Sequence, residues 1–184
     1  MRKIGFVSFN LIFLLFCLIF LYSISTQNAF ASPVNYSLAW PGILPDNKIY
    51  KLKVLRDKVI AKMIISPIKK IEFDLLMADK TIYASQLLVD KNEVNLAKDT
   101  ALKGENFFSI LVIDYSRAVS IHLKIPRDLD MKIDLAAIKH QEVFDFIINK
   151  VNVGDKKMFE IANNFSKTNY NLILEIRNNQ HNHK

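Results

Sequence analysis

From Val94 to Ala118 a small or apolar residue recurs at every third or fourth position without a break. Steps of three and four follow one face of an α-helix. The residues of this seam are Val94, Ala97, Ala101, Gly104, Phe108, Leu111, Tyr115 and Ala118. The pattern predicts a long helix that starts near Asn92 and packs against neighbouring helices, as in a helical bundle.

Gly104 lies in the middle of this seam. A glycine inside a helix costs about 1 kcal/mol relative to alanine, so a packing reason is expected for it. Together with Ala97 and Ala101, it makes the N-terminal half of the seam narrow. We therefore expect a neighbouring backbone to approach closely there, and we prefer this interpretation to a hinge.

Four other segments show helical spacing, and helix-breaking glycines are scarce. The predicted helices cover 48–64, 67–91, 129–151 and the stretch from the turn at Gly154 to about Arg177. The residues expected on their inner faces are Leu52, Leu55, Val59 and Met63; Ile68, Ile71, Leu75, Ala78, Ile82 and Val89, with Ser85 as a polar exception; Ile133, Ala137, His140, Phe144 and Ile147; and Met158, Ile161, Ala162, Phe165, Leu172, Ile173 and Ile176. The sequence thus predicts an all-α, up-and-down bundle of about five helices that follows an N-terminal signal or anchor helix.

The segment 119–125 does not fit this spacing. Apolar residues alternate with Ser120, His122 and Lys124, which is the period of a β-strand. A frayed helix end and a short extended piece before Pro126 fit the pattern equally well.

The N-terminus predicts export. Arg2 and Lys3 precede an apolar run from Ile4 to Tyr22, and Ala29-Phe30-Ala31 matches the small-x-small pattern of signal peptidase sites. Residues 1–31 are therefore interpreted as a signal peptide that is cleaved after Ala31. Retention as an anchor is the alternative, because about 20 apolar residues span a bilayer. In both cases the rest of the chain is expected to be extracytoplasmic: secreted, periplasmic, or anchored and facing outside.

The remaining chain divides into three parts. Residues 32–47 are rich in proline and glycine and predict an extended lead-in, 48–177 predict the helical bundle domain, and 178–184 predict a polar, disordered tail. The only cysteine is Cys17, so the exported part has no disulfide and no thiolate metal site.

The sequence contains no catalytic or phosphate-binding motif, and we expect neither an enzyme nor a cofactor. His140 is interpreted as a hydrogen-bonded core or rim residue. His181 and His183 could hold a transition metal weakly, although two ligands without a third make a poor site. Asp128, Asp130 and Asp134 cluster at a helix start and are interpreted as favouring the positive end of its dipole; an enzyme that uses surface carboxylates with Asp79 and Lys80 is a further alternative.

The chain carries a formal net charge of +7, and much of it is local. The basic residues expected to meet a partner are Lys48, Lys51, Lys53, Arg56, Lys58 and Lys62. An anionic membrane surface or an acidic cell-wall polymer would suit them, since each charge near an anionic surface contributes about 1 kcal/mol. A solvated lysine-rich face is the alternative. Nucleic acid is not expected, because the patch lacks interleaved aromatic residues and the domain is exported.

The stretch from Pro41 to Phe108 contains four short motifs in a fixed order: Leu44-Pro45-Asp46, Tyr50-x-Leu52-Lys53-x-Leu55-Arg56, Ser66-Pro67-x-Lys69-Lys70-Ile71-Glu72 and Met77-Ala78-Asp79-Lys80-Thr81. In these motifs the chain resembles a family of exported bacterial helical proteins that is catalogued only as a domain of unknown function. It departs from the family pattern at Lys51, Ser66, Ile71 and Thr81. The resemblance implies a signal peptide followed by a helical bundle in bacteria, and it implies no catalytic residues.

These observations lead to one expectation of function and one alternative. The chain is expected to be an exported, non-enzymatic helical structural or binding module at the outer face of the cytoplasmic membrane. The alternative is a periplasmic metal- or stress-sensing helical protein that uses His181 and His183. The protein partner and the oligomeric state are left open by the sequence.

Overall fold

The computed structural model describes residues 34–182. Within this range the chain forms five α-helices and one short 3₁₀ turn and has no strand, which confirms the all-α prediction. The elements are α2 (Tyr50–Met63), α3 (Pro67–Asp90), α4 (Val94–Ser120), α5 (Arg127–Lys150), η1 (Val153–Asp155) and α6 (Lys156–Asn182). The predicted signal peptide, its cleavage site, Cys17 and His183 lie outside the described residues.

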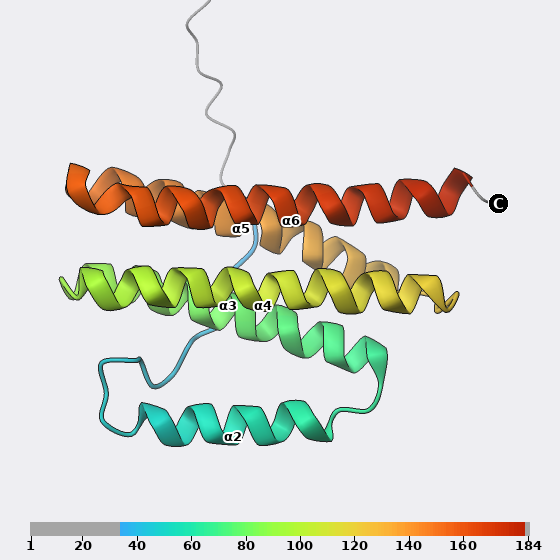
Figure 1. Cartoon of the computed structure of the whole chain (residues 1–184), viewed down its shortest axis with the longest axis horizontal. Helices are drawn as coiled ribbons and strands as arrows, with labels where there is room; N and C mark the ends of the chain where they lie inside the picture. Colours follow the sequence, from blue (N-terminus) through green and yellow to red (C-terminus); the bar gives the residue numbers. More distant parts are fainter. Residues whose placement is uncertain (1–33, 183–184) are drawn as a thin grey trace, which may run out of the picture. The chain divides into compact units, whose positions relative to one another are not determined.

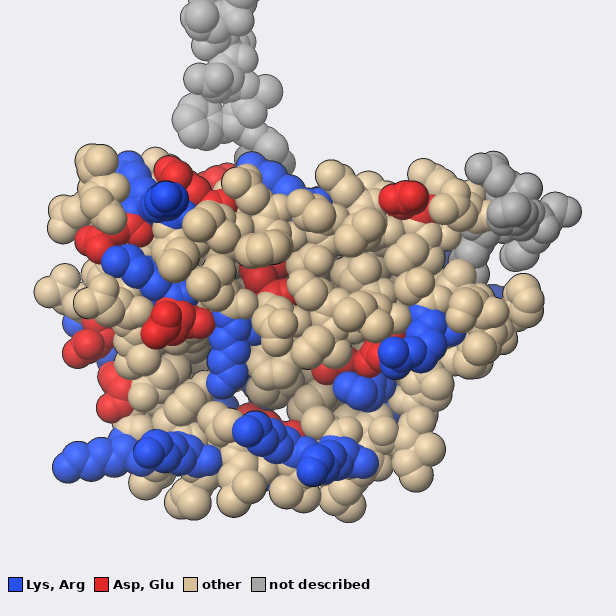
Figure 2. Space-filling view, in the orientation of Figure 1, with Lys and Arg blue, Asp and Glu red and all other residues tan. Residues whose placement is uncertain are grey.

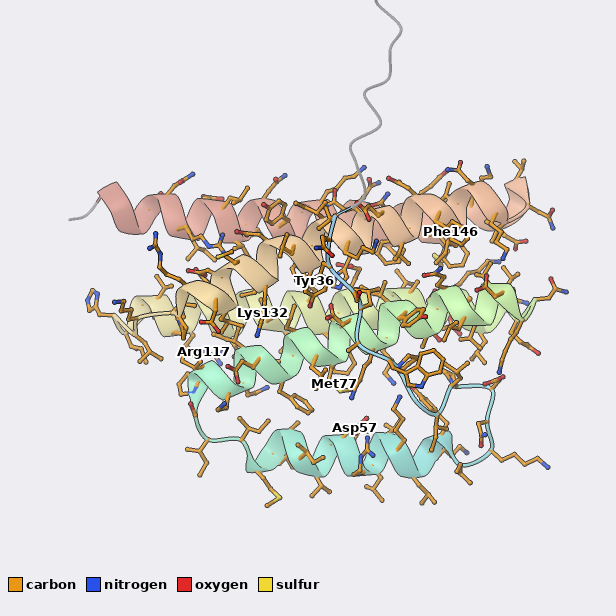
Figure 3. All side chains as sticks on the ribbon, turned by 180° about the vertical axis from the view of Figure 1, so that it is seen from behind. Tyr36, Asp57, Met77, Arg117, Lys132 and Phe146 are labelled. Atoms are coloured by element: carbon orange, nitrogen blue, oxygen red, sulfur yellow. The ribbon has the colours of Figure 1, made fainter. Side chains whose placement is uncertain are left out.

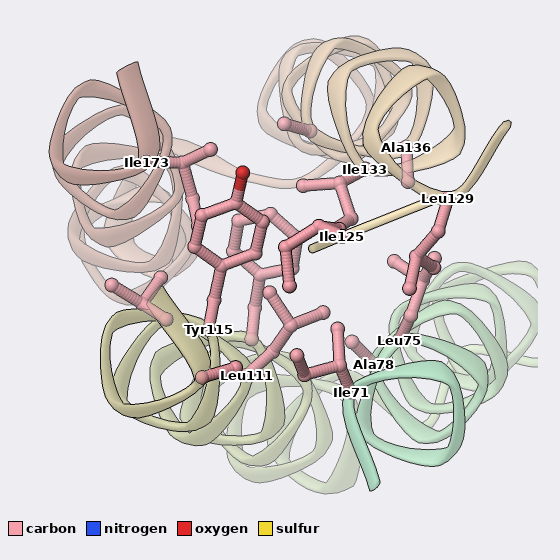
Figure 4. Packing of buried hydrophobic residues seen from close by; sticks show 14 residues of the cluster. Ile71, Leu75, Ala78, Leu111, Tyr115, Ile125, Leu129, Ile133, Ala136 and Ile173 are labelled. Atoms are coloured by element: carbon pink, nitrogen blue, oxygen red, sulfur yellow. The ribbon is translucent and has the colours of Figure 1, made fainter. Parts of the chain in front are cut away.

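Four of the helices form two stacked hairpins. Helices α3 and α4 pair along their length, as do α5 and α6, while α4 packs on α6 and α3 packs on α5. Successive helices run in opposite directions, so α4 and α6 run side by side in the same direction (Figure 1). Viewed along the bundle, the four helices enclose a core to which Ile71, Leu111, Ile133 and Ile173 each contribute (Figure 4).

The α3–α4 pair is close because of Gly104. A Cβ atom at this position would lie 2.5 Å from Ile82 Cγ1 and 3.2 Å from the Ile82 backbone nitrogen on α3. The neighbouring Ala97 and Ala101 are fully buried at the same interface. The expectation that this glycine permits a close backbone approach is therefore confirmed.

Helices α3 and α4 end in the same way. Asn92 and His122 adopt positive φ angles of 63° and 58° after the last helical turn. In α4 the N–H groups of His122 and Leu123 donate to the carbonyls of Val119 and Ala118, the two bonds of a Schellman motif. Segment 119–125 is thus a helix end at Ser120 followed by a left-handed turn, and Ile125 is buried beyond it.

Helix α2 differs from the prediction. It contains no buried residue, and the four side chains expected on its inner face, Leu52, Leu55, Val59 and Met63, are all exposed. The physical reason is that α2 is apolar on two opposite sides. Its other side, with Tyr50, Val54 and Ala61, faces the bundle, and the sequence pattern alone did not distinguish the two sides.

Helix α6 also differs from the prediction. Met158, Phe165 and Leu172 were expected to be buried and are exposed. The residues that face inward on this helix include Phe159, Ala162, Asn163, Ser166, Asn169 and Ile173. Because three of these are polar, an apolar pattern could not trace the seam. The prediction of a disordered tail from residue 178 is wrong for 178–182, where no glycine or proline interrupts the helix and α6 continues to Asn182.

The described part of the lead-in, residues 34–47, has no helix or strand, ends in a turn from Leu44 to Asn47, and lies on the bundle. The side chains of Tyr36 and Leu38 pack against the hydrophobic core. The backbone N–H of Val34 donates to Glu142 Oε1 on α5 at 2.8 Å, and Lys91, after α3, pairs with Asp46 at 2.7 Å. The lead-in therefore fixes where the chain enters α2.

Candidate functional site

The side of α2 that faces away from the bundle carries an apolar stripe. We call Leu52, Leu55, Val59 and Met63 the outer stripe; their spacing of three and four residues places them on one helix face. Between 50% and 74% of each residue is exposed. Scattered exposed apolar residues are ordinary on protein surfaces, but a contiguous stripe indicates an interaction surface.

Exposed lysines flank the outer stripe. Lys48, Lys51, Lys58 and Lys62 are exposed, and none of the four forms an ion pair with any residue in the described range. We call these four residues the basic rim. In Figure 2, Lys and Arg side chains follow the lower edge of the molecule, where Figure 1 places α2.

Two of the six predicted basic residues, Lys53 and Arg56, contact other groups of the chain. The Lys53 ammonium turns toward the lead-in and donates to the carbonyl oxygens of Pro41 and Ile43 at 2.7 and 3.2 Å. Arg56 pairs with Asp57 at 2.6 Å. Asp57 is the only acidic residue between Lys48 and Ile65, and only 12% of its side chain is exposed. The outward side of α2 therefore combines apolar and positively charged groups.

A second group of polar residues lies inside the bundle. Asp79, Glu105, His140, Ser166 and Asn169 come from all four helices and separate the two hydrophobic clusters of the core. We call this group the polar layer. Each of the five is at most 5% exposed, and buried polar groups of this kind need hydrogen-bond partners to be tolerated.

The contacts in the polar layer are centred on His140. Its Nε2 lies 2.9 Å from Asp79 Oδ1, while Asp79 Oδ2 accepts a 2.6 Å hydrogen bond from Tyr36 of the lead-in. Its Nδ1 lies 3.7 Å from Glu105 Oε1, and Glu105 Oε2 accepts from Asn169 at 3.3 Å. The interpretation of His140 as a hydrogen-bonded core residue is therefore confirmed.

Burial changes the acidity of Glu105. Removal from water raises the pKa of its carboxyl to about 7, although His140, Asn169 and Ser166 act in the opposite direction. The protonated form of Glu105 therefore predominates only below about pH 7. Glu105 Oε1 and His140 Nδ1, which are 3.7 Å apart, have no hydrogen-bond partner among the described residues. Residues of the two hydrophobic clusters lie on both sides of the polar layer, and all five of its residues are buried.

The clustered acidic residues at the start of α5 meet a cation from α6. The Arg177 guanidinium contacts Asp134 Oδ1 at 2.7 Å and Asp130 Oδ1 at 3.1 Å, and its Nε donates to the Tyr115 hydroxyl at 3.1 Å. Asp130 and Asp134 thus join α5 to α6, a role that the sequence did not predict. Asp128 is exposed and lies in the first turn of α5, where the helix dipole favours a carboxylate.

The described residues do not bring metal ligands together. No group of three or more His, Cys, Asp or Glu side chains in that part of the chain could hold a metal ion. His140 Nε2 already contacts Asp79 Oδ1. Lys80, which follows Asp79 on α3, is half-buried. The side chain of His181 lies outside what is described, as does His183, so the proposed metal role of these two residues stays a prediction.

The sequence reasoning found the basic residues and the apolar spacing of α2 but missed the polar layer. Asp79 and Glu105 directly follow Ala78 and Gly104, which were recognised on the inner seams. A carboxylate next to a seam residue on two helices, with His140 on a third, is the signal that could have revealed it. Finding these contacts would also have required the position of each helix along the bundle axis relative to its neighbours.

Comparisons with protein-family models, curated proteins and solved structures gave no match. The resemblance to a family of exported bacterial helical proteins therefore stays a prediction. Among the helices of residues 34–182, none is both long enough and apolar enough to cross a membrane.

Proposed function

We propose that this chain is an exported, non-enzymatic module that binds the anionic outer surface of the cytoplasmic membrane through α2. The outer stripe is the observation that carries the proposal. Its four apolar side chains point away from the bundle, and the basic rim lies beside them. A helix with exposed apolar residues flanked by lysines is suited to lie in the interface between headgroups and acyl chains.

The magnitudes favour a bilayer over an acidic wall polymer. Full burial of a leucine-sized side chain contributes about 1.5–3 kcal/mol, whereas each lysine near an anionic surface contributes about 1 kcal/mol. A hydrated polymer would use the lysines but leave the outer stripe in water. Only a surface with an apolar interior uses both sets of groups.

The non-enzymatic part of the proposal is supported by the burial of the polar layer. His140, Glu105 and Asp79 would be the natural acid and base groups of an active site, and each is at most 3% exposed. Their hydrogen bonds are made to one another and to Tyr36 and Asn169. This arrangement suits a role in fixing how the helices pack.

The experiment is co-sedimentation of fragment 32–184 with phosphatidylglycerol vesicles, after circular dichroism has shown that the fragment is helical. We expect the fragment to bind, to bind less at high salt, and to bind pure phosphatidylcholine weakly. The variant Leu55→Ser/Val59→Ser should lose binding, while Ile113→Ser, which changes an exposed residue of α4, should keep it.

A second pair of variants separates the contributions of charge. Lys51→Gln/Lys62→Gln should weaken binding to anionic vesicles, whereas Lys132→Gln/Lys167→Gln removes two exposed lysines from α5 and α6 and should matter less. If the lysine variants lose binding but the outer-stripe variant does not, an acidic polymer is the better partner. Equal vesicle binding by all variants would contradict the proposal.

A further inference from the structure

The inner side of α2 covers a cavity that is separate from the outer stripe. It has a volume of about 320 Å³ and lies between α2 and the α3–α4 hairpin. Roughly ten groups of water size fit into this volume at about 30 Å³ each. Asp57 on α2 and Met77 on α3, both labelled in Figure 3, belong to its wall.

One part of the cavity wall is basic. The ammonium groups of Lys53 and Lys103 lie 5.4 and 5.3 Å from the centre of the Tyr50 ring. Lys103 donates to the Tyr50 hydroxyl at 3.2 Å, and Lys53 donates to two backbone carbonyls of the lead-in. An ammonium has three donors, so these contacts leave both lysines with donor capacity.

Neither Lys53 nor Lys103 forms an ion pair with a residue of the described part of the chain. The carboxylate in the cavity wall, Asp57, contacts Arg56 at 2.6 Å. Burial lowers the pKa of Lys53, and the nearby charges of Lys80, Arg56 and Lys103 lower it further, against the opposing effect of Asp57. An anion placed between Lys53 and Lys103 would relieve this repulsion.

Lys58 of the basic rim also lines the cavity, as does Thr81, and the rest of the wall is mostly apolar. Val54 and Ala61 from α2 face Phe73 and Met77 from α3 and Phe107 from α4. Because α2 has no buried residue, a ligand can enter beside it without breaking the hydrophobic core. A ligand that fits this cavity therefore has an anionic group at one end and an apolar body of matching size.

We propose that this cavity binds an amphiphilic anion, in which a carboxylate or phosphate contacts Lys53 and Lys103 and an apolar chain of about ten heavy atoms contacts Phe73, Met77 and Phe107. The ligand source is either a free fatty-acid-like anion or a lipid of the bilayer. The site lies on the side of α2 opposite to the outer stripe, so it does not depend on membrane binding by that stripe.

The test is calorimetric titration of the full chain with decanoate below its micelle-forming concentration. Lys103→Met should weaken decanoate binding about tenfold or more, because a charge-assisted hydrogen bond is lost. Ala61→Phe should abolish binding by filling the cavity. Lys132→Met removes a lysine from α5 that does not line the cavity and should leave binding unchanged.

Two further arms complete the experiment. Decyltrimethylammonium, which has a similar chain and the opposite charge, should not bind at this site. If the natural ligand is a bilayer lipid, Ala61→Phe will also reduce binding to phosphatidylglycerol vesicles; if it is a free anion, vesicle binding will be unchanged. Equal decanoate affinity in the original chain, Lys103→Met and Ala61→Phe would overturn the proposal, and the vesicle result with the outer stripe would still stand.

Discussion

The hydroxyl of Tyr36 donates a 2.6 Å hydrogen bond to Asp79 Oδ2, which joins the extended lead-in to the polar layer of the bundle. Burial and the charge of Asp79 raise the pKa of the Tyr36 hydroxyl, so it keeps its proton and remains a donor at neutral pH. The lead-in is therefore a structural part of the domain.

Tyr36→Phe removes this donor and leaves the buried Oδ2 of Asp79 without its hydrogen bond. We expect the free energy of unfolding to fall by about 1–3 kcal/mol, as measured by urea denaturation. Tyr83→Phe is the matched control, because the Tyr83 ring contacts Trp40 through its edge and face and keeps that contact without its hydroxyl. Equal effects of the two substitutions would argue against a structural role for the lead-in bond.

Gly104→Ala tests the close approach of α3 and α4. The added methyl group would collide with Ile82, and overpacking of this kind destabilises a fold by about 1–3 kcal/mol. The better helix propensity of alanine stabilises the helix by about 1 kcal/mol and offsets part of this loss. We expect a net loss of stability in thermal unfolding. Gly154→Ala is the control, since nothing lies within 4 Å of a Cβ atom there; a stabilised Gly104→Ala variant would show that the helices are farther apart.

Glu105 makes stability depend on pH. Its pKa is about 7 in the folded chain, against an ordinary value of 4.5. Between these values the folded chain holds a proton that the unfolded chain has released, so stability should fall as the pH rises from about 4.5 to about 7. Glu105→Gln should remove this part of the dependence and be the more stable chain near pH 8.

In Glu105→Gln we expect the free energy of unfolding still to depend on pH at lower pH values. Burial and the neighbouring Asp114 raise the pKa of Asp74 to about 6, although Lys70 acts against them, and this shift has the same sign. Urea denaturation of both chains between pH 4 and pH 8 provides the measurement. An unchanged slope between pH 6 and pH 7 in Glu105→Gln would exclude Glu105 as its source.

His122→Gly tests the left-handed turn after α4. His122 has a φ of 58°, and this region costs a residue with a Cβ atom about 1–2 kcal/mol, of which the greater flexibility of glycine in the unfolded chain cancels a part. We expect His122→Gly to stabilise the fold by about 0.5–1 kcal/mol. Asn92→Gly should have a smaller effect, because asparagine tolerates this conformation better; a destabilised His122→Gly would contradict the assignment of the turn.

The fold was predictable from sequence where a helix has one apolar side. The seam of α4 is buried from Ala97 to Ala118, because it is the face on which the spacing of three and four residues runs without a break. For α2 the choice was wrong: Leu52 and Val59 formed the more regular pattern, but Val54 and Ala61 on the opposite side face the bundle across a cavity. Hydrophobic spacing identifies a face without specifying what covers it.

The polar layer could not be predicted for a different reason. Asp79, Glu105 and His140 are far apart in sequence, and their proximity depends on the relative heights of α3, α4 and α5 in the bundle. Those heights follow from details such as the contact of Gly104 with Ile82. Spacing along one helix carries no information about its shift relative to the next.

The central claim is that the outer stripe of α2 contacts an anionic bilayer, and spin labelling tests it most directly. In the full chain with Cys17→Ser, a nitroxide is attached at Val59→Cys or, as a control, at Ile113→Cys on α4, both exposed positions. On phosphatidylglycerol vesicles, the label at position 59 should become shielded from an aqueous nickel complex and accessible to dissolved oxygen, while the label at position 113 stays in water. If both labels remain equally accessible to the nickel complex, α2 does not lie on the membrane and the account is wrong.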